Sequence, residues 1–337
     1  MTVGVLRLCG WQLALIAIVL GIGRPWPLAA LLWAGALLLL ALTAVRVRGR
    51  WLGEWLSLAL RYSARDRQVD LGSAGPPGPA LLRRLDPDAT GSTVRVGDEP
   101  IHLISRASGI TAILRPAVGD PAAVLGAPET LLPAADPTIA VQVLHHAGID
   151  RRQPPRTWLA LQVLRTAETY QDAELQRTLG NAVRRVRKHL RRLGCPAGAL
   201  AEHEVFGTLA ALAHVTGGRG QIRESWRHWQ SGPIGQATFR LDGWSEAARS
   251  GTRQLTGWLL AAAPHTAVTI SITAHRAAPD PEPRVRATLR LAAANPQALA
   301  QSEGQLTEAA RHCAITLTRL DGRHAEGMAA TLPIGLS

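Results

Sequence analysis

Apolar residues gather at the front of the chain and later recur in short, regularly spaced runs. Residues 26–45, WPLAALLWAGALLLLALTAV, are twenty positions without a charge. As a helix they would span roughly 30 Å, the thickness of a bilayer's hydrocarbon core. Residues 8–23 are also uncharged, and they reach a spanning length if the helix starts at Val3 and Arg7 extends to the headgroups. We therefore predict a transmembrane helical hairpin over residues 1–48, with spans at about 3–23 and 26–45.

The arginines around these runs predict the orientation of the hairpin. A cleaved signal peptide would explain one apolar run but not two. The turn between the runs carries only Arg24, whereas six arginines follow the second run: Arg46, Arg48, Arg50, Arg61, Arg65 and Arg67. Positive flanks stay in the cytoplasm. We expect a two-pass protein of the inner (plasma) membrane with both termini cytoplasmic.

Residues 49–68 contain an amphipathic pattern, RWLGEWLSLALRYSARDR. Its apolar residues recur at helical spacing, which predicts a juxtamembrane helix. Such a helix can lie on an anionic leaflet or pack on a partner's helix, and the pattern does not separate the two. The predicted membrane or partner interface consists of Trp51, Trp55, Tyr62, Arg46, Arg48 and Arg50.

Residues 69–99 are rich in proline and glycine, as in GSAGPPGP at 72–79 and DPDATGS at 86–92. This composition shows no apolar periodicity and predicts a linker.

Residues 100–337 alternate between strand-like and helix-like patterns, which predicts a mixed α/β cytoplasmic domain. The first half has strand patterns at 101–106, 110–117, 138–146 and 157–165, a helix with an apolar stripe from Leu175 to Leu193, and a helix over 200–215. After a polar stretch near 216–235, where a second domain could begin, strands are expected at 237–241, 267–275, 284–291 and 315–320, with helices at 245–261 and 296–313. That order is β-α-β-β-α-β, the split βαβ pattern, and a final strand is expected at 329–334.

The net charge of +12 favours anionic partners without choosing between nucleic acid, lipid and acidic protein. The helix near 175–193 carries Arg184, Arg185 and Lys188 on its polar face. Such a row can bind phosphates, meet an acidic partner or simply be solvated. Because no aromatic residues are interleaved with it, the pattern disfavours nucleic acid.

Trp226, Trp229 and Trp244 form a dense aromatic group within RESWRHWQSGPIGQATFRLDGW. Tryptophans in a polar loop can anchor a partner, or they can cap the core where a loop meets the sheet. We name these three residues, with Arg184, Arg185 and Lys188, as a candidate partner surface.

The sequence shows no catalytic, metal or cofactor site. A P-loop, a dinucleotide-binding glycine motif and a nucleophile elbow are absent, and the three cysteines have no metal-binding spacing. Asp321, His324 and Glu326 lie close together, but Asp321-Gly322 is a turn dipeptide. We expect these three residues on the exposed tip of a β-hairpin.

Several segments in order resemble the EccE family of the actinobacterial type VII secretion system. They are the two-span front with RWLGEWLSLALRYSARDR, the Pro/Gly-rich stretch, LGNAVRRVRKHLRRLGCPAGAL, SWRHWQSGPIGQATFRLDGW and the closing RLDG and ATLPIG. The resemblance implies a non-catalytic subunit of the inner-membrane complex that exports WXG-type substrates. It implies assembly with EccB, EccC and EccD in the bilayer, with no nucleic acid, cofactor or small-molecule substrate. EccC supplies the ATPase, which agrees with the missing P-loop.

Two other hypotheses stay open at this level. The α/β pattern is compatible with a membrane-anchored enzyme resembling a nucleotide-sugar transferase, although the only Asp-x-Asp, at Asp86 and Asp88, lies in the predicted linker. The two arginine-rich runs are compatible with a membrane-tethered binder of anionic lipid or nucleic acid.

Overall fold

The computed structural model describes residues 2–47, 50–96, 99–117, 125, 127–133, 138–249, 251–277 and 280–336. Arg48 of the predicted interface lies outside these residues. The chain divides into two compact units, Met1–Asp66 and Arg67–Ser337, which we describe separately.

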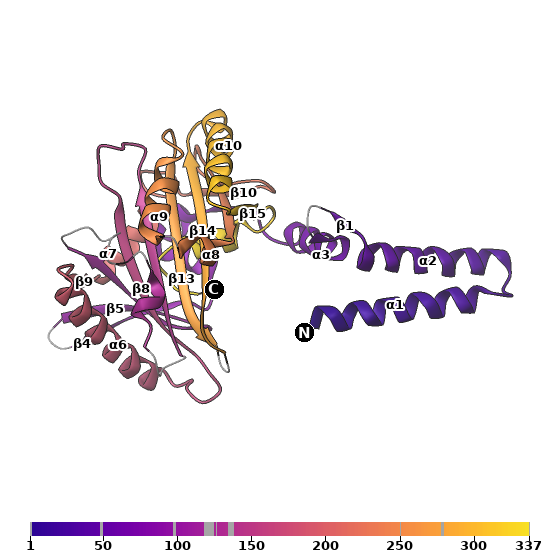
Figure 1. The fold of residues 1–337 in the computed structure, drawn as a ribbon, viewed down its shortest axis with the longest axis horizontal. Coiled ribbons are helices and arrows are strands. Elements are labelled where there is room, and N and C mark those ends of the chain that lie inside the picture. The colour runs from indigo at the N-terminus through magenta and orange to yellow at the C-terminus, as the bar shows by residue number, and fades with distance from the viewer. Residues whose placement is uncertain are drawn as a thin grey trace. The chain divides into compact units, whose positions relative to one another are not determined.

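The first unit begins with a hairpin of two helices, α1 (Thr2–Gly21) and α2 (Trp26–Ala44) (Figure 1). Small residues let the two helices approach: Gly10, Ala14, Gly21, Ala29 and Ala36 are buried. Gly21 also leaves room for the Trp33 ring. By length and composition α2 can cross a membrane, whereas the apolar part of α1, Leu8–Gly21, is shorter. One of the two predicted spans is therefore a candidate membrane helix, and the two-pass topology stays a proposal.

A two-residue ladder follows α2. It pairs β1 (Arg46–Val47) with β2 (Arg50–Trp51) and leads into the amphipathic helix α3 (Leu52–Ser63). The helix starts where Glu54 accepts a hydrogen bond from the Trp51 backbone, as at a capping box.

The described part of the second unit is built on one antiparallel sheet of 13 strands, which confirms the mixed α/β prediction. Its strands are β3 (Gln68–Asp70), β4 (Thr90–Val96), β5 (Glu99–Arg106), β6 (Gly109–Pro116), β7 (Ile139–Ala147), β8 (Arg156–Leu164), β9 (Ala197–Ala199), β10 (Gln221–Glu224), β11 (Trp229–Ser231), β12 (Ile234–Asp242), β13 (Ala267–Ala277), β14 (Asp280–Ala293) and β15 (Thr316–Arg319). Its helices are η1 (Leu71–Ala74), α4 (Pro77–Leu85), η2 (Pro128–Leu131), α6 (Asp172–Arg192), α7 (Glu202–Leu212), α8 (Trp244–Ala248), α9 (Thr252–Ala261), α10 (Pro296–His312) and α11 (His324–Ala330).

The strand pairings show that this sheet contains the same arrangement twice. In the first repeat, β9, β6, β8 and β7 lie side by side in that order. In the second repeat the order is β15, β12, β14 and β13. Numbered along the chain, both orders are 4-1-3-2, the arrangement of a split βαβ unit. The pattern predicted for 237–320 is present, and the first half repeats it.

Each repeat is also flanked in the same way. A hairpin precedes it, β4–β5 in the first and β10–β11 in the second, and the second strand of each hairpin pairs with the strand that follows. A short helix, α7 or α11, closes each repeat. The two repeats join through β7 and β13, which pair antiparallel from Ala140–His275 to Ala147–Val268.

The long helices α6 and α10 end in the same turn. The amide of Cys195 donates to Leu190 O, and that of Ile315 donates to Ala310 O. The residue before each donor has a positive φ, 73° at Gly194 and 56° at Ala314. This is the Schellman ending, which glycine adopts without strain and alanine does not.

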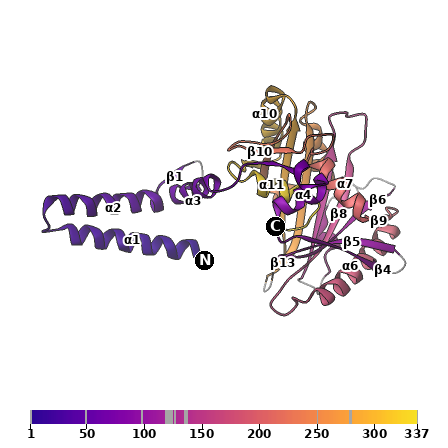
Figure 2. The same cartoon turned by 180° about the vertical axis from the view of Figure 1, so that it is seen from behind.

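Helices cover both faces of the sheet. On one face α6 buries Leu179 and Val183 against the first repeat, while α9 and α10 bury Leu259 and Leu306 against the second. On the other face α4, α7, α11 and the C-terminal residues form a third core, which includes Trp158 and Trp229 (Figure 2).

Residues 69–99 are not a linker in the structure. They contain α4, whose Leu81 and Leu82 are buried in the third core, and strand β4. The prolines that suggested a spacer instead begin α4, because proline at a first helical turn costs no hydrogen bond.

The final strand expected at 329–334 is also wrong. Residues 324–330 form α11, and the residues after it bond to side chains of the sheet. Gln142 donates to Leu332 O at 3.0 Å and accepts from Gly335 N at 3.0 Å, while Thr111 donates to Ile334 O at 3.1 Å. These side chains satisfy the backbone that a strand would have paired.

Replacing Ala314 by glycine should raise the free energy of unfolding by about 1 kcal/mol, because it removes the strain of a positive φ. Gly194→Ala is the matched variant. It should lower the free energy by a similar amount, since a methyl there meets no atom within 4 Å and only the backbone is strained. Urea unfolding of the full chain in detergent measures both. Equal stabilities for Ala314→Gly and the parent would contradict the shared helix ending.

Candidate functional site

Helix α3 presents an apolar surface that its own unit leaves uncovered. None of its residues is buried, and Leu60 is 61% exposed. Trp55 donates to Val47 O at 2.9 Å, and the Arg46 guanidinium lies 4.3 Å from the centre of the Trp51 ring. Trp51, Trp55 and Tyr62 are half-buried. The tryptophans thus fix the start of α3, while Leu56 and Leu60 are exposed.

The basic row of α6 is exposed, as its polar pattern predicts. Arg184, Arg185 and Lys188 lie on the side of the helix opposite its buried stripe. Arg187, by contrast, forms an ion pair with Glu99 at 2.7 Å. The row therefore presents three exposed cationic side chains on one side of α6.

Two of the three tryptophans proposed as a partner surface belong to the core. Trp229 is 1% and Trp244 is 3% exposed, so neither can contact a partner. Trp226 is half-buried and packs where Gly322 turns, because a Cβ on Gly322 would lie 2.9 Å from its ring. The interpretation that tryptophans cap the core is correct for Trp229 and Trp244.

The Asp321–Glu326 segment leads into helix α11 rather than forming a hairpin tip, and only Glu326 of the three residues is exposed. Arg319 of β15 pairs with Glu303 of α10 at 2.7 Å and with Asp321 at 2.9 Å. It also donates to Arg227 O at 2.6 Å. His324, expected at the surface, is fully buried at the start of α11. The turn at Asp321-Gly322 is present, but a helix follows it because the next residues pack on the sheet.

Burial decides the protonation of this Arg319 cluster. Burial and the neighbouring Arg319 lower the pKa of His324 to about 3. Burial also raises the pKa of Glu303, against the opposing effect of Arg319. His324 Nε2 lies 4.0 Å from Asp321 Oδ1, beyond hydrogen-bond distance. The cluster ties β15, α10 and the 225–228 loop together and lacks the geometry of a catalytic dyad.

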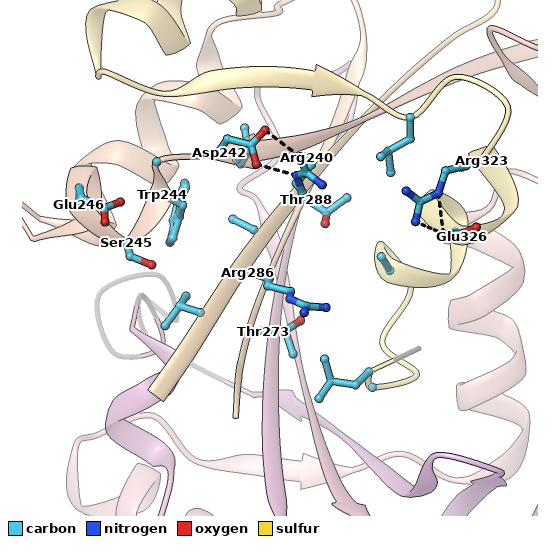
Figure 3. A pocket seen from close by; sticks show the side chains of 18 residues that line it. Arg240, Asp242, Trp244, Ser245, Glu246, Thr273, Arg286, Thr288, Arg323 and Glu326 are labelled. Atoms are coloured by element: carbon cyan, nitrogen blue, oxygen red, sulfur yellow. Dashed lines mark hydrogen bonds and ion pairs between the residues drawn. The ribbon is translucent and has the colours of Figure 1, made fainter. Parts of the chain in front are cut away.

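A hollow of about 530 Å³ opens beside the end of β12 (Figure 3). Arg240, Arg286 and Arg323 line it, together with the acidic residues Asp242, Glu246 and Glu326. Arg240 binds Asp242 at 2.6 Å, and Arg323 pairs with Glu326 across one helical turn. Burial alone would raise the pKa of Asp242, but hydrogen bonds from Arg240 and Thr318 hold it below its ordinary value. The hollow is thus balanced in charge, and Asp242 stays ionised near neutral pH.

The described residues contain no group of three or more His, Cys, Asp or Glu side chains placed to hold a metal. Neither histidine nor cysteine lines the hollow beside β12.

One buried cation and two histidines lie under α7. Arg290 of β14 donates to Leu212 O at 2.8 Å and to Gln236 Oε1 at 2.9 Å. Burial lowers the pKa of Arg290 to about 9. The Leu212 carbonyl belongs to the negative end of the α7 dipole, which stabilises this charge. Burial and Arg290 together lower the pKa of His146 to about 4 and that of His214 to about 3.

Acid should therefore destabilise the fold. His146, His214 and His324 have a pKa below the ordinary 6.5 in the folded chain, so below pH 6.5 the unfolded chain binds more protons. At pH 5 each should cost about 2 kcal/mol of the free energy of unfolding that is present at pH 7.5. Urea unfolding at both pH values measures this loss. His324→Asn should reduce the loss of unfolding free energy between pH 7.5 and pH 5, whereas His203→Asn, at an exposed position, should leave that loss unchanged. The same loss in both variants would refute this assignment.

Residues 153–241 match the protein-family model described as "Putative type VII ESX secretion system translocon, EccE". The match begins just before β8 and includes α6, α7 and most of β12, so it contains the basic row and Trp229. No curated protein matches the chain. Over residues 153–241 this chain is therefore similar to the EccE family of type VII secretion.

Proposed function

We propose that this chain is a non-catalytic structural subunit of the type VII secretion complex in the inner membrane. The family match carries the proposal. The candidate membrane helix α2 supports it, as do the exposed surfaces of α3 and α6.

In this proposal α1 and α2 cross the membrane as a two-pass anchor with both termini in the cytoplasm. The charge distribution supports that orientation, because Arg24 stands alone in the turn while Arg46, Arg61, Arg65 and Arg67 follow α2. The sheet unit then supports the assembly of EccB, EccC and EccD for export of WXG-type substrates. Neither a cofactor nor a catalytic residue of this chain takes part.

Native co-purification tests the proposal. A C-terminal tag, gentle solubilisation and mass spectrometry should recover the chain with a P-loop ATPase and a multi-span membrane protein. Recovery of the chain alone from native membranes would contradict the proposal.

The double variant Trp51→Ala, Trp55→Ala should release the protein from the complex and leave it in the membrane. The rings fix the start of α3 through the Arg46 and Val47 contacts, so their loss should displace the leucines that face a partner. Co-purification and membrane fractionation measure the two effects separately. Ser57→Ala is the control on the same helix. Full retention in the complex would show that α3 lies on lipid.

Reversing the α6 row (Arg184→Glu, Arg185→Glu, Lys188→Glu) should weaken association with the complex at least tenfold at low salt. The loss should shrink near 0.5 M salt, because exposed charges are screened there. Arg249→Glu, Arg253→Glu and Arg311→Glu change the net charge equally at exposed positions elsewhere. Affinity of the solubilised chain for the remaining complex is the readout. Equal loss in both variants would assign the effect to net charge alone.

A further inference from the structure

Strand β4 ends the sheet with an open edge. It is the last strand in the order of the sheet, next to β5, and in the described part of the chain no strand pairs with its other side. The edge is seven residues long, Thr90–Val96. An edge of this length presents unpaired backbone N–H and C=O groups that can template another strand.

In the second repeat, the strand that corresponds to β4 has a further strand paired with its outer edge. Strand β10 occupies the position of β4, as the first strand of the hairpin that leads into the repeat. The outer side of β10 carries the added antiparallel strand β3, with Val69 opposite Ile222. The same architecture therefore accepts one more strand beyond the hairpin, and only the second repeat supplies it from the described chain.

The side chains of β4 suit a pairing strand. Val94 and Val96 are half-buried on the face covered by α6, and Thr93 and Arg95 lie exposed on the other face. An incoming strand could extend the apolar layer on one face and meet Arg95 on the other, since side chains alternate along a strand.

Charge decides which kind of strand fits. Helix α6 lies against the β4 end, because a Cβ on Gly180 would be 3.5 Å from Val96 Cγ2. Arg177 and Arg184, about one turn to either side of Gly180, are exposed. Figures 1 and 2 show β4 and α6 at the same end of the sheet. A second copy paired through β4 would bring two such cationic borders together, whereas an acidic segment would neutralise one.

We propose that β4 binds an extended, acidic segment of another polypeptide in the complex as an added strand. Backbone pairing along residues 90–96 supplies the affinity, and Arg95, Arg177 and Arg184 select acidic side chains. This inference rests on the proposed function, because the segment comes from a companion subunit.

Hydrogen exchange of the β4 amides tests it, with the complex purified through this chain compared with the chain extracted alone. An added strand should slow exchange at least tenfold at alternate residues of 90–96, because only alternate amides face outward while β5 already protects the others. Equal rates in both samples, or slowing without alternation, would overturn the proposal. Slowing in the chain alone at high concentration would mean pairing with a second copy and would overturn it too.

The variant Arg95→Glu with Arg177→Glu should remove most of that protection, and Arg95→Lys should keep it. The chain must still co-purify with the P-loop ATPase in this experiment. A parent chain that never co-purifies refutes the proposed function, whereas a co-purifying chain with unprotected β4 amides refutes the added strand alone.

Discussion

The pairing of β7 with β13 is the contact on which the rest of the sheet unit depends. It joins two split βαβ repeats edge to edge, so that one sheet runs from β4 to β3. Both strands are buried on both faces, with Val143 opposite Ile272 at the centre. Without this pairing each repeat would expose a long edge strand, β7 in the first and β13 in the second.

This constraint explains why polar groups gather in the core near the junction. Gln142 of β7 donates to Ser271 of β13 at 2.9 Å and also holds the C-terminal residues. In the same way, Arg290 of β14 donates to the Leu212 carbonyl at the end of α7. Each repeat closes with a short helix whose final carbonyls bond to side chains of the sheet. The arrangement leaves the outer face of α6 and the edge of β4 exposed, as the proposed role in assembly requires.

The sequence predicts the elements with strong periodicity and misses those whose packing is decided elsewhere. The stripe from Leu175 to Leu193 predicts α6, and its exposed row follows from the same spacing. Helix α4 was missed because its nine residues include prolines and a glycine, and burial of Leu81 and Leu82 stabilises it. Trp229 and Trp244 could not be assigned to core or surface, because single tryptophans in loops carry no periodicity. His324 was misplaced because α11 forms on a sheet that no local pattern reveals.

The most direct test of this account is native-state hydrogen exchange of the sheet unit in the full chain, as a function of denaturant. Amides of β6 and β8 report on the first repeat, and those of β12 and β14 on the second. If the junction makes the two repeats one cooperative unit, the amides of both repeats should open with the same free energy and the same dependence on denaturant. A first repeat that opens at a clearly lower free energy, while the second stays closed, would contradict a single sheet joined by β7 and β13.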